Sequence, residues 1–268
     1  MLNLSYLCKK LRQMTLFNQK YMAYEPFVRD VHDHFENEGT YVYGGRRNLI
    51  KSFEAPDGQK IVVKRYGQRN PINRLVYSAG IRKPKGLRAF EYASLLLEKG
   101  IETPDVVAYI EERRCHLLGH SYLVSMFCPF EHTLYDLESL STDELIPLAH
   151  ALARFVANMH DHGVVHLDFS PGNILWEHSD GEYRFSVVDI NRMWFGRVDM
   201  KTGCRSFERL MAPTSFLCAL AHEYARLRGF DDKQAVALTL KYNIYFQKYI
   251  ETKSRAREMR KEHHWHLL

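Results

Sequence analysis

The stretch that decides the fold is His166-Leu167-Asp168-Phe169-Ser170-Pro171-Gly172-Asn173-Ile174-Leu175. It has the form H-x-D-x-x-x-x-N and lies between two apolar runs. Phosphoryl transfer from ATP depends on positioning and on charge neutralisation rather than on covalent chemistry by the protein. Asp168 could lie beside an attacking hydroxyl group, and Asn173 could offer an oxygen ligand to Mg²⁺. Alone, the pattern is also compatible with an ordinary polar loop.

A second carboxylate follows soon after, in Val187-Val188-Asp189-Ile190-Asn191-Arg192. Asp189 ends an apolar strand. Mg²⁺ prefers hard oxygen ligands, commonly one or two carboxylates together with phosphate oxygens. Asp189 is therefore a second expected metal ligand, although an aspartate at a strand end can also simply cap a turn.

Upstream, Val62-Val63-Lys64 ends an apolar strand with a lysine that could reach the α- and β-phosphates of ATP. Glu91, in the next predicted helix, is its expected carboxylate partner. Gly44 and Gly45 separate two predicted strands, and glycine allows backbone N–H groups to approach phosphates closely. Each feature has an ordinary alternative: a solvent-facing lysine, a solvated helix face and a simple turn.

The order of these residues along the chain favours one fold. The residues occur in the order found in protein kinases and on the expected element types: Gly44, Gly45, Lys64, Glu91, Asp168, Asn173 and Asp189. We therefore predict an α+β, two-lobed protein-kinase-like fold with a small β-rich N-lobe and a larger, mainly helical C-lobe. The expected divisions are an N-terminal extension, helical or irregular, over 1–38, the N-lobe over 39–128 and the C-lobe over 129–268.

Apolar periodicity and turn residues predict the individual elements. Strands are expected over 40–43, 48–53, 59–66, 106–111, 116–126 and 185–190, and a strand–loop–strand over 164–176. Helices are expected over 87–100, 141–162, 215–228 and 232–257. Residues 67–86 are rich in turn-forming and basic residues and are expected to form a loop.

The composition restricts the class of protein further. The 268 residues carry a net charge of +5, which suits an anionic partner but does not choose among ATP, a phosphorylated glycan, nucleic acid and a membrane surface. The five cysteines are scattered with no CxxC pair, so no zinc site is predicted and the simplest expectation is reduced thiols. No apolar run is long enough to span a bilayer, and residues 1–17 make a poor signal peptide. We expect a cytoplasmic protein, with peripheral membrane contact as an open alternative.

The chain resembles the bacterial lipopolysaccharide core kinases, which phosphorylate Kdo or heptose sugars of the inner core. Three features carry the resemblance, which runs over about residues 39–230. They are the loop 166–175 with Pro171-Gly172 inside it, the form Asp189-Ile190-Asn191-Arg192 in place of Asp-Phe-Gly, and the short region 196–210 with no Ala-Pro-Glu motif.

The resemblance implies roles for the candidate residues. Asp168 would be the catalytic base, Asn173 and Asp189 the Mg²⁺ ligands, Lys64 the phosphate clamp and Glu91 its partner. It also implies ATP and Mg²⁺ as cofactors and an anionic glycolipid acceptor, with possible contact at the cytoplasmic face of the inner membrane. No nucleic-acid partner is expected. His166 would be structural, and Arg192 has no assigned role.

A basic run, residues 65–88, supports an anionic acceptor. It contains seven cations and no Asp or Glu, and they are Arg65, Arg69, Arg74, Arg82, Lys83, Lys85 and Arg88. The run could bind acidic sugars or lipid phosphates. It could equally be a solvated loop.

Three rival functions stay open at this point. A small-molecule phosphotransferase of the aminoglycoside or choline type would favour an acidic pocket, which the basic run opposes. An atypical Ser/Thr protein kinase would need a peptide-docking region, and the segment after Asp189 is short for one. A pseudokinase scaffold commonly lacks the base or a metal ligand, whereas every such position is filled here.

Overall fold

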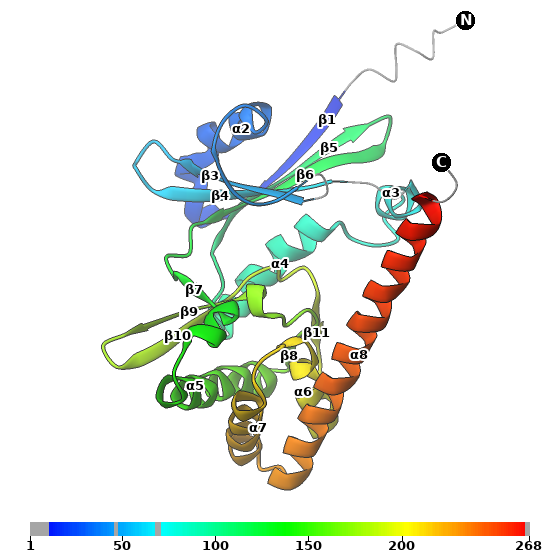
Figure 1. Ribbon diagram of the computed structural model, residues 1–268. Coiled ribbons are helices and arrows are strands. Elements are labelled where there is room, and N and C mark those ends of the chain that lie inside the picture. The colour runs from blue at the N-terminus through cyan, green and yellow to red at the C-terminus, as the bar shows by residue number, and fades with distance from the viewer. Residues whose placement is uncertain (1–10, 46–47, 68–70, 266–268) are drawn as a thin grey trace, which may run out of the picture. The chain divides into compact units, whose positions relative to one another are not determined.

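The computed structural model describes residues 11–45, 48–67 and 71–265 (Figure 1). The chain divides into two units. The first comprises residues 1–129 together with the short segment 189–192, and the second comprises 130–188 and 193–268. Asp189 and the three residues after it are grouped with the β-rich unit, although they follow most of the second unit in sequence.

The first unit is built on one antiparallel sheet of six strands in the order β1-β5-β6-β4-β3-β2. The strands are β1 (Leu11–Phe17), β2 (Thr40–Gly44), β3 (Asn48–Glu54), β4 (Lys60–Tyr66), β5 (Val106–Arg114) and β6 (Leu117–Met126). Five of these follow from the sequence pattern. The strand β1 does not, because 1–38 was expected to be helical or irregular. It forms an edge of the sheet by pairing with β5, from Leu11 opposite Arg114 to Phe17 opposite Ala108.

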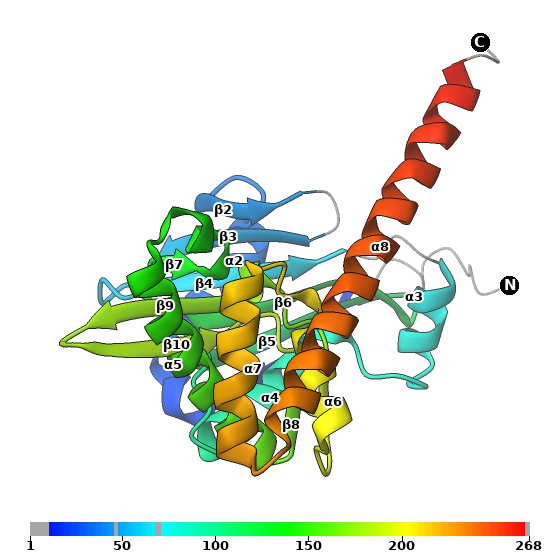
Figure 2. The same cartoon turned by 60° about the horizontal axis from the view of Figure 1, so that its bottom comes forward.

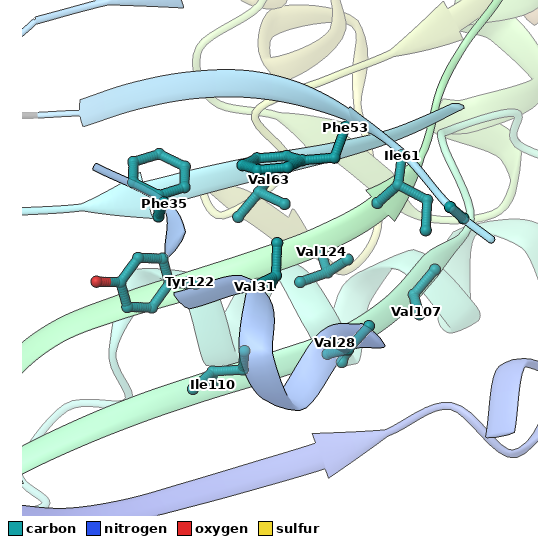
Figure 3. Close-up of a cluster of buried hydrophobic side chains, with 12 residues drawn as sticks. Val28, Val31, Phe35, Phe53, Ile61, Val63, Val107, Ile110, Tyr122 and Val124 are labelled. Carbon is teal, nitrogen blue, oxygen red and sulfur yellow. The ribbon is translucent and has the colours of Figure 1, made fainter. Parts of the chain in front are cut away.

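Three α-helices accompany this sheet, and they are α2 (Glu25–His34), α3 (Pro71–Ser78) and α4 (Lys85–Glu98). The helix α2 buries Val28 and Val31 against one face of the sheet. Figure 3 shows these residues with Phe35, Ile61 and Val63 in a continuous apolar cluster. The helix α4 matches its prediction, whereas α3 lies in a region that was expected to be a loop.

Alternation along β4 decides which side chains reach the opposite face. Because Ile61 and Val63 face α2, Lys64 and Tyr66 must point the other way. On that face Gly86, at the start of α4, is so close that a Cβ would lie 3.2 Å from the Tyr66 ring and 2.7 Å from the Tyr109 ring. The strand therefore delivers Lys64 to the face that α4 covers.

The second unit is mainly helical. Its α-helices are α5 (Thr142–Asp161), α6 (Met200–Ser206), α7 (Thr214–Arg228) and α8 (Asp232–Trp265). The helix α7 packs against both α5 and α8, and Figure 2 shows α7 and α8 side by side. The helix α5 begins with a capping box, in which the Glu144 carboxylate accepts a hydrogen bond of 2.9 Å from the Ser141 backbone N–H.

Short strands carry the loops of this unit. The pair β8 (Val164–His166) and β11 (Met193–Phe195) is antiparallel, and a second sheet has the order β10-β9-β7. Its strands are β7 (His132–Thr133), β9 (Ile174–Ser179) and β10 (Glu182–Val187). The 3₁₀ turn Pro171–Asn173 lies between β8 and β9, as the strand–loop–strand pattern predicts.

Two further expectations were tested by the fold. Within the described part of the chain, no helix combines the length and apolarity needed to cross a membrane. Cys128, Cys204 and Cys218 carry reduced thiols, as expected for these three residues.

Candidate active site

The expected base, Asp168, lies in the loop that leaves β8, and a buried histidine fixes this loop. His166 Nδ1 accepts a hydrogen bond of 3.1 Å from the Asp168 backbone N–H. Its Nε2 lies 3.0 Å from the backbone oxygen of Val188, which can only accept. Both ring nitrogens are therefore used by the neutral tautomer with its proton on Nε2. This geometry fits a structural role for His166 and holds the backbone at Asp168 in place.

Asn173 closes the same loop. Its Nδ2 donates to the backbone oxygen of Asp168 at 2.8 Å, across five residues. The Asn173 backbone oxygen accepts from the Val188 N–H at 3.0 Å. Because the amide nitrogen is used in this way, the amide oxygen is the atom that Asn173 presents to a cation. The H-x-D-x-x-x-x-N spacing thus gives one hydrogen-bonded turn that carries both a carboxylate and an amide oxygen.

A residue that was not expected from the sequence contacts the carboxylate itself. Arg209 Nη1 lies 3.0 Å from Asp168 Oδ1, and both side chains are partly buried. The Arg209 guanidinium carbon is 4.8 Å from the centre of the Phe246 ring in α8, and its Nε is buried with no hydrogen-bond partner. Arg209 is therefore held between a ring and the expected catalytic carboxylate.

Asp189 belongs to the first unit, where it contacts Lys64. Lys64 Nζ donates to Asp189 Oδ1 at 2.6 Å, and the lysine side chain is only 15% exposed. Asp189 has a φ of 57°, a left-handed conformation that aspartate tolerates better than most residues. Asn191 Nδ2 donates to the same carboxylate oxygen at 2.5 Å. The turn Asp189-Ile190-Asn191 therefore holds the carboxylate in a fixed position.

Asn191 was quoted in the sequence motif but given no role. Its side chain is buried, and its Oδ1 has no hydrogen-bond partner. A buried acceptor without a donor costs free energy unless a proton donor or a cation approaches it. The orphaned oxygen next to the Asp189 carboxylate is thus an observation that favours cation binding here.

The partner expected for Lys64 has to be corrected for this structure. The Glu91 carboxylate accepts from Lys83 Nζ at 2.6 Å and 2.8 Å, on the exposed side of α4. Lys64 is instead paired with Asp189. The physical reason is that Glu91 is 38% exposed and Lys83 precedes α4 by two residues, so the local partner is within easy reach.

The two glycines differ in what they require. Gly44 has a φ of 106°, and a Cβ there would lie 2.1 Å from the Asn48 backbone oxygen. Gly45 has open space around it, and its N–H donates to the same Asn48 oxygen at 2.8 Å. The backbone conformation therefore requires glycine at position 44 but not at position 45. Both residues lie at the turn end of the β2–β3 pair.

The candidate residues are divided between the units. Asp168, Asn173 and Arg209 lie in the second unit, and Gly44, Gly45, Lys64, Glu91 and Asp189 lie in the first. In the described ranges, no cluster of three or more His, Cys, Asp or Glu side chains could hold a metal ion. The expected ligands are one carboxylate and one amide oxygen, a set that suits Mg²⁺ when phosphate oxygens and water supply the remaining ligands.

A β-rich unit with a half-buried strand lysine, followed by a helical unit with the Asp168–Asn173 turn, defines the protein-kinase-like class of phosphotransferases. The model of the lipopolysaccharide kinase (Kdo/WaaP) family matches residues 43–211, which is more than half of the chain. The chain belongs to the lipopolysaccharide kinase (Kdo/WaaP) family. It is a kinase, a phosphotransferase with an alcohol group as acceptor.

The fold is shared with a solved structure. WaaP in complex with acyl carrier protein has a TM-score of 0.54 and 19% identity, over 87% of this chain and 99% of that chain. The streptomycin–ATP–APH(2")-IIa ternary complex has a TM-score of 0.49 and 14% identity, over 81% of this chain and 86% of that chain. The Rio2 kinase–ADP/Mg²⁺–phosphoaspartate complex from Chaetomium thermophilum has a TM-score of 0.46 and 16% identity, over 82% of this chain and 75% of that chain. A search of curated protein sequences found no match. At 19% identity, the likeness to WaaP shows a shared fold.

Proposed function

We propose that this kinase transfers the γ-phosphoryl group of ATP, with Mg²⁺, to a hydroxyl group of a Kdo or heptose sugar in the lipopolysaccharide inner core. The observation that carries the proposal is the Asp168–Asn173 turn, because it combines a carboxylate and an amide oxygen on one rigid loop. Membership of the family supports a lipopolysaccharide acceptor.

The proposed roles follow from the contacts of each residue. Asp168 accepts the proton of the attacking sugar hydroxyl. Lys64 binds the phosphates, and the Gly44-Gly45 turn between β2 and β3 lets the backbone come close to them. Glu91 would exchange Lys83 for Lys64 when Asp189 binds the metal. Asn173 and Asp189 would hold Mg²⁺, which supplies charge neutralisation at the transferring phosphate.

We further propose a bacterial enzyme that works in the cytoplasm, at the inner-membrane face where a glycolipid acceptor would be reached. The rival acceptors are an aminoglycoside or amino alcohol and a protein hydroxyl. A scaffold without turnover is the remaining rival, and the complete set of Lys64, Asp168, Asn173 and Asp189 argues against it.

The test is a phosphoryl-transfer assay with radiolabelled ATP and Mg²⁺ on four acceptors: Kdo-lipid A, heptosylated core, an aminoglycoside and a generic protein. We expect transfer to a core sugar, and a loss of about 10²–10⁴-fold in Asp168→Asn with ATP binding retained. The isosteric Asp168→Asn substitution keeps the shape of the loop, so the loss would report on the base. Transfer only to the aminoglycoside or the protein, or full activity of the variant, would overturn the proposal.

A further inference from the structure

The segment 71–83, comprising α3 and the five residues after it, presents large aliphatic side chains to solvent. Ile72 is 70% exposed, Leu75 is 58% exposed and Ile81 is 77% exposed. Ile72 and Leu75 are three residues apart and therefore share one face of α3. Single exposed aliphatic residues are ordinary on protein surfaces. All three lie within ten residues, two on α3 and one in the turn that follows it.

This segment is anchored to the sheet by its other face. Tyr77 is buried, and Arg74 Nε donates to the Leu118 backbone oxygen at 2.8 Å. Ser78 Oγ accepts from the Leu118 N–H at 2.8 Å and donates to the Arg74 backbone oxygen at 2.6 Å. Ile72 and Leu75 are thus held outward by a fixed helix. Ile72 and Leu75 are exposed because α3 packs on β6 with its opposite face.

Positive charge accompanies the aliphatic residues. No acidic residue occurs from Gly58 to Phe90, and Arg82 and Lys83 are exposed directly after Ile81. Burial, with repulsion from Arg82, lowers the pKa of Arg88, which shows that cations lie close to one another here. The contacts also divide the basic run 65–88. Arg65 pairs with Glu36, Arg74 binds the sheet and Lys83 pairs with Glu91, which leaves Arg82 as the exposed cation directly beside the aliphatic face.

This combination fits an anionic lipid surface better than a protein partner. Interfacial elements place aliphatic side chains at the boundary of headgroups and acyl chains, with lysine and arginine at the phosphates. Protein interfaces concentrate their binding energy in Trp, Tyr and Arg. In this segment the single tyrosine, Tyr77, is turned inward, and Arg74 is engaged by Leu118.

We propose that residues 71–83 dock the enzyme on a bilayer that carries anionic phosphate groups. Ile72, Leu75 and Ile81 enter the headgroup region, and Arg82 contacts the phosphates. The inference deepens the proposed function, because an enzyme with a lipid-linked acceptor has to work at such a surface. It does not depend on Asp168 or on any other residue of the candidate active site.

The first experiment measures partitioning of the full chain onto vesicles by sedimentation. Vesicles of phosphatidylethanolamine and phosphatidylglycerol are compared with vesicles of phosphatidylcholine. We expect binding to the anionic vesicles only, and a loss of about tenfold or more in the Ile72→Ser/Leu75→Ser double variant. Arg82→Gln should lose about fivefold at low salt, and less at high salt. The matched control is Ile244→Ser, an exposed isoleucine of α8, which should bind as the wild type does.

The second experiment separates docking from catalysis. Phosphoryl transfer is measured to the same core sugar in two forms, embedded in anionic vesicles and deacylated in water. The Ile72→Ser/Leu75→Ser variant should lose transfer to the embedded form and keep transfer to the soluble form. Wild-type binding to vesicles without transfer to either acceptor would support the docking surface and overturn the proposed function instead.

Three results would overturn the docking proposal. In the first, the wild-type chain does not bind anionic vesicles. In the second, the Ile72→Ser/Leu75→Ser variant binds these vesicles as well as the wild type does. In the third, that variant loses transfer to the soluble acceptor as much as to the embedded one. If the wild-type chain does not bind vesicles but binds an acidic protein through this segment, the surface belongs to a protein partner.

Discussion

The guanidinium group of Arg209 and the carboxylate of Asp168 form an ion pair of 3.0 Å across 41 residues of sequence, within the second unit. A carboxylate that accepts a proton from a substrate has to point at the hydroxyl group, and Asp168 can rotate about its side-chain bonds. The contact with Arg209 removes that freedom from a side chain whose backbone His166 already fixes. We therefore propose that Arg209 positions the Asp168 carboxylate, and its effect should appear in turnover.

We predict that Arg209→Gln lowers kcat by about tenfold or more, because small errors in the placement of a reacting group are costly. The KM for ATP should stay close to that of the wild type. Arg209→Lys, which keeps the charge, should recover part of the loss, and added guanidinium should partly rescue Arg209→Ala. Steady-state kinetics with separate titrations of ATP and acceptor measure these effects.

The matched control is Arg205→Gln. Arg205 lies in α6 close to Arg209, is 69% exposed and pairs with Glu208 at 3.3 Å. An exposed pair of this kind contributes little, so kcat should not change. A raised KM for ATP with unchanged kcat in Arg209→Gln would contradict the positioning role.

The Phe246 ring supports the same guanidinium from α8, a helix beyond the region matched by the family model. We predict that Phe246→Ala lowers kcat by about two- to fivefold, the equivalent of a cation–π contact of roughly 0.5–1 kcal/mol. In the Arg209→Gln background the same substitution should have no further effect, because the two residues act through one contact. Tyr245→Ala, on an exposed neighbour, is the control. Additive losses in the double variant would mean that Phe246 acts elsewhere.

The sequence predicts the parts of the site that lie within one local pattern. Asp168 and Asn173 are five residues apart on one turn, so their spacing alone brings them together. The same holds for the strands β2 to β6, whose side chains alternate. Arg209 could not be predicted, because it is one of several arginines in the sequence. Which arginine reaches Asp168 is decided only by the packing of α8 against the 3₁₀ turn Phe207–Arg209.

The missed strand and the corrected ion pair have the same origin. β1 is an edge strand whose pairing with β5 comes from backbone hydrogen bonds, and its polar residues Arg12, Gln13 and Thr15 weaken the apolar pattern. Glu91 was assigned to Lys64 from the order of residues in kinases, but order does not determine which cation is nearest. Lys83 is only eight residues before Glu91 and lies close enough to form the ion pair in place of Lys64.

The two glycines of the β2–β3 turn provide a matched pair of substitutions. Gly44→Ala would place a Cβ against the Asn48 backbone and force a φ of 106° on alanine, at a cost of about 1–3 kcal/mol. We predict a weaker affinity for ATP, by about tenfold, because the turn must rearrange. Gly45→Ala meets open space and should bind ATP as the wild type does. Nucleotide titrations followed by calorimetry measure both. Equal effects in the two variants would indicate that the backbone conformation at Gly44 does not matter for nucleotide binding.

His160 predicts how stability depends on pH. It is buried in α5, and its Nδ1 lies 2.7 Å from the Tyr224 hydroxyl group of α7. Burial, with a smaller contribution from Arg228, lowers the pKa of His160 from 6.5 to about 3. Between these values the unfolded chain binds a proton that the folded chain does not, so the folded state loses stability as pH falls below about 6.5.

We predict that this one group lowers the free energy of unfolding by about 1.4 kcal/mol for each pH unit between about pH 6 and about pH 3, and contributes no slope above about pH 7. His160→Gln can still contact Tyr224 but does not titrate, so its stability should fall less steeply with acid even if it is lower at neutral pH. Urea unfolding at several pH values measures the slope. The control is His222→Gln in α7, whose histidine is exposed beside Asp232 and should leave the slope close to that of the wild type. An unchanged slope in His160→Gln would show that His160 is protonated in the folded chain, and that the contact between α5 and α7 tolerates the charge.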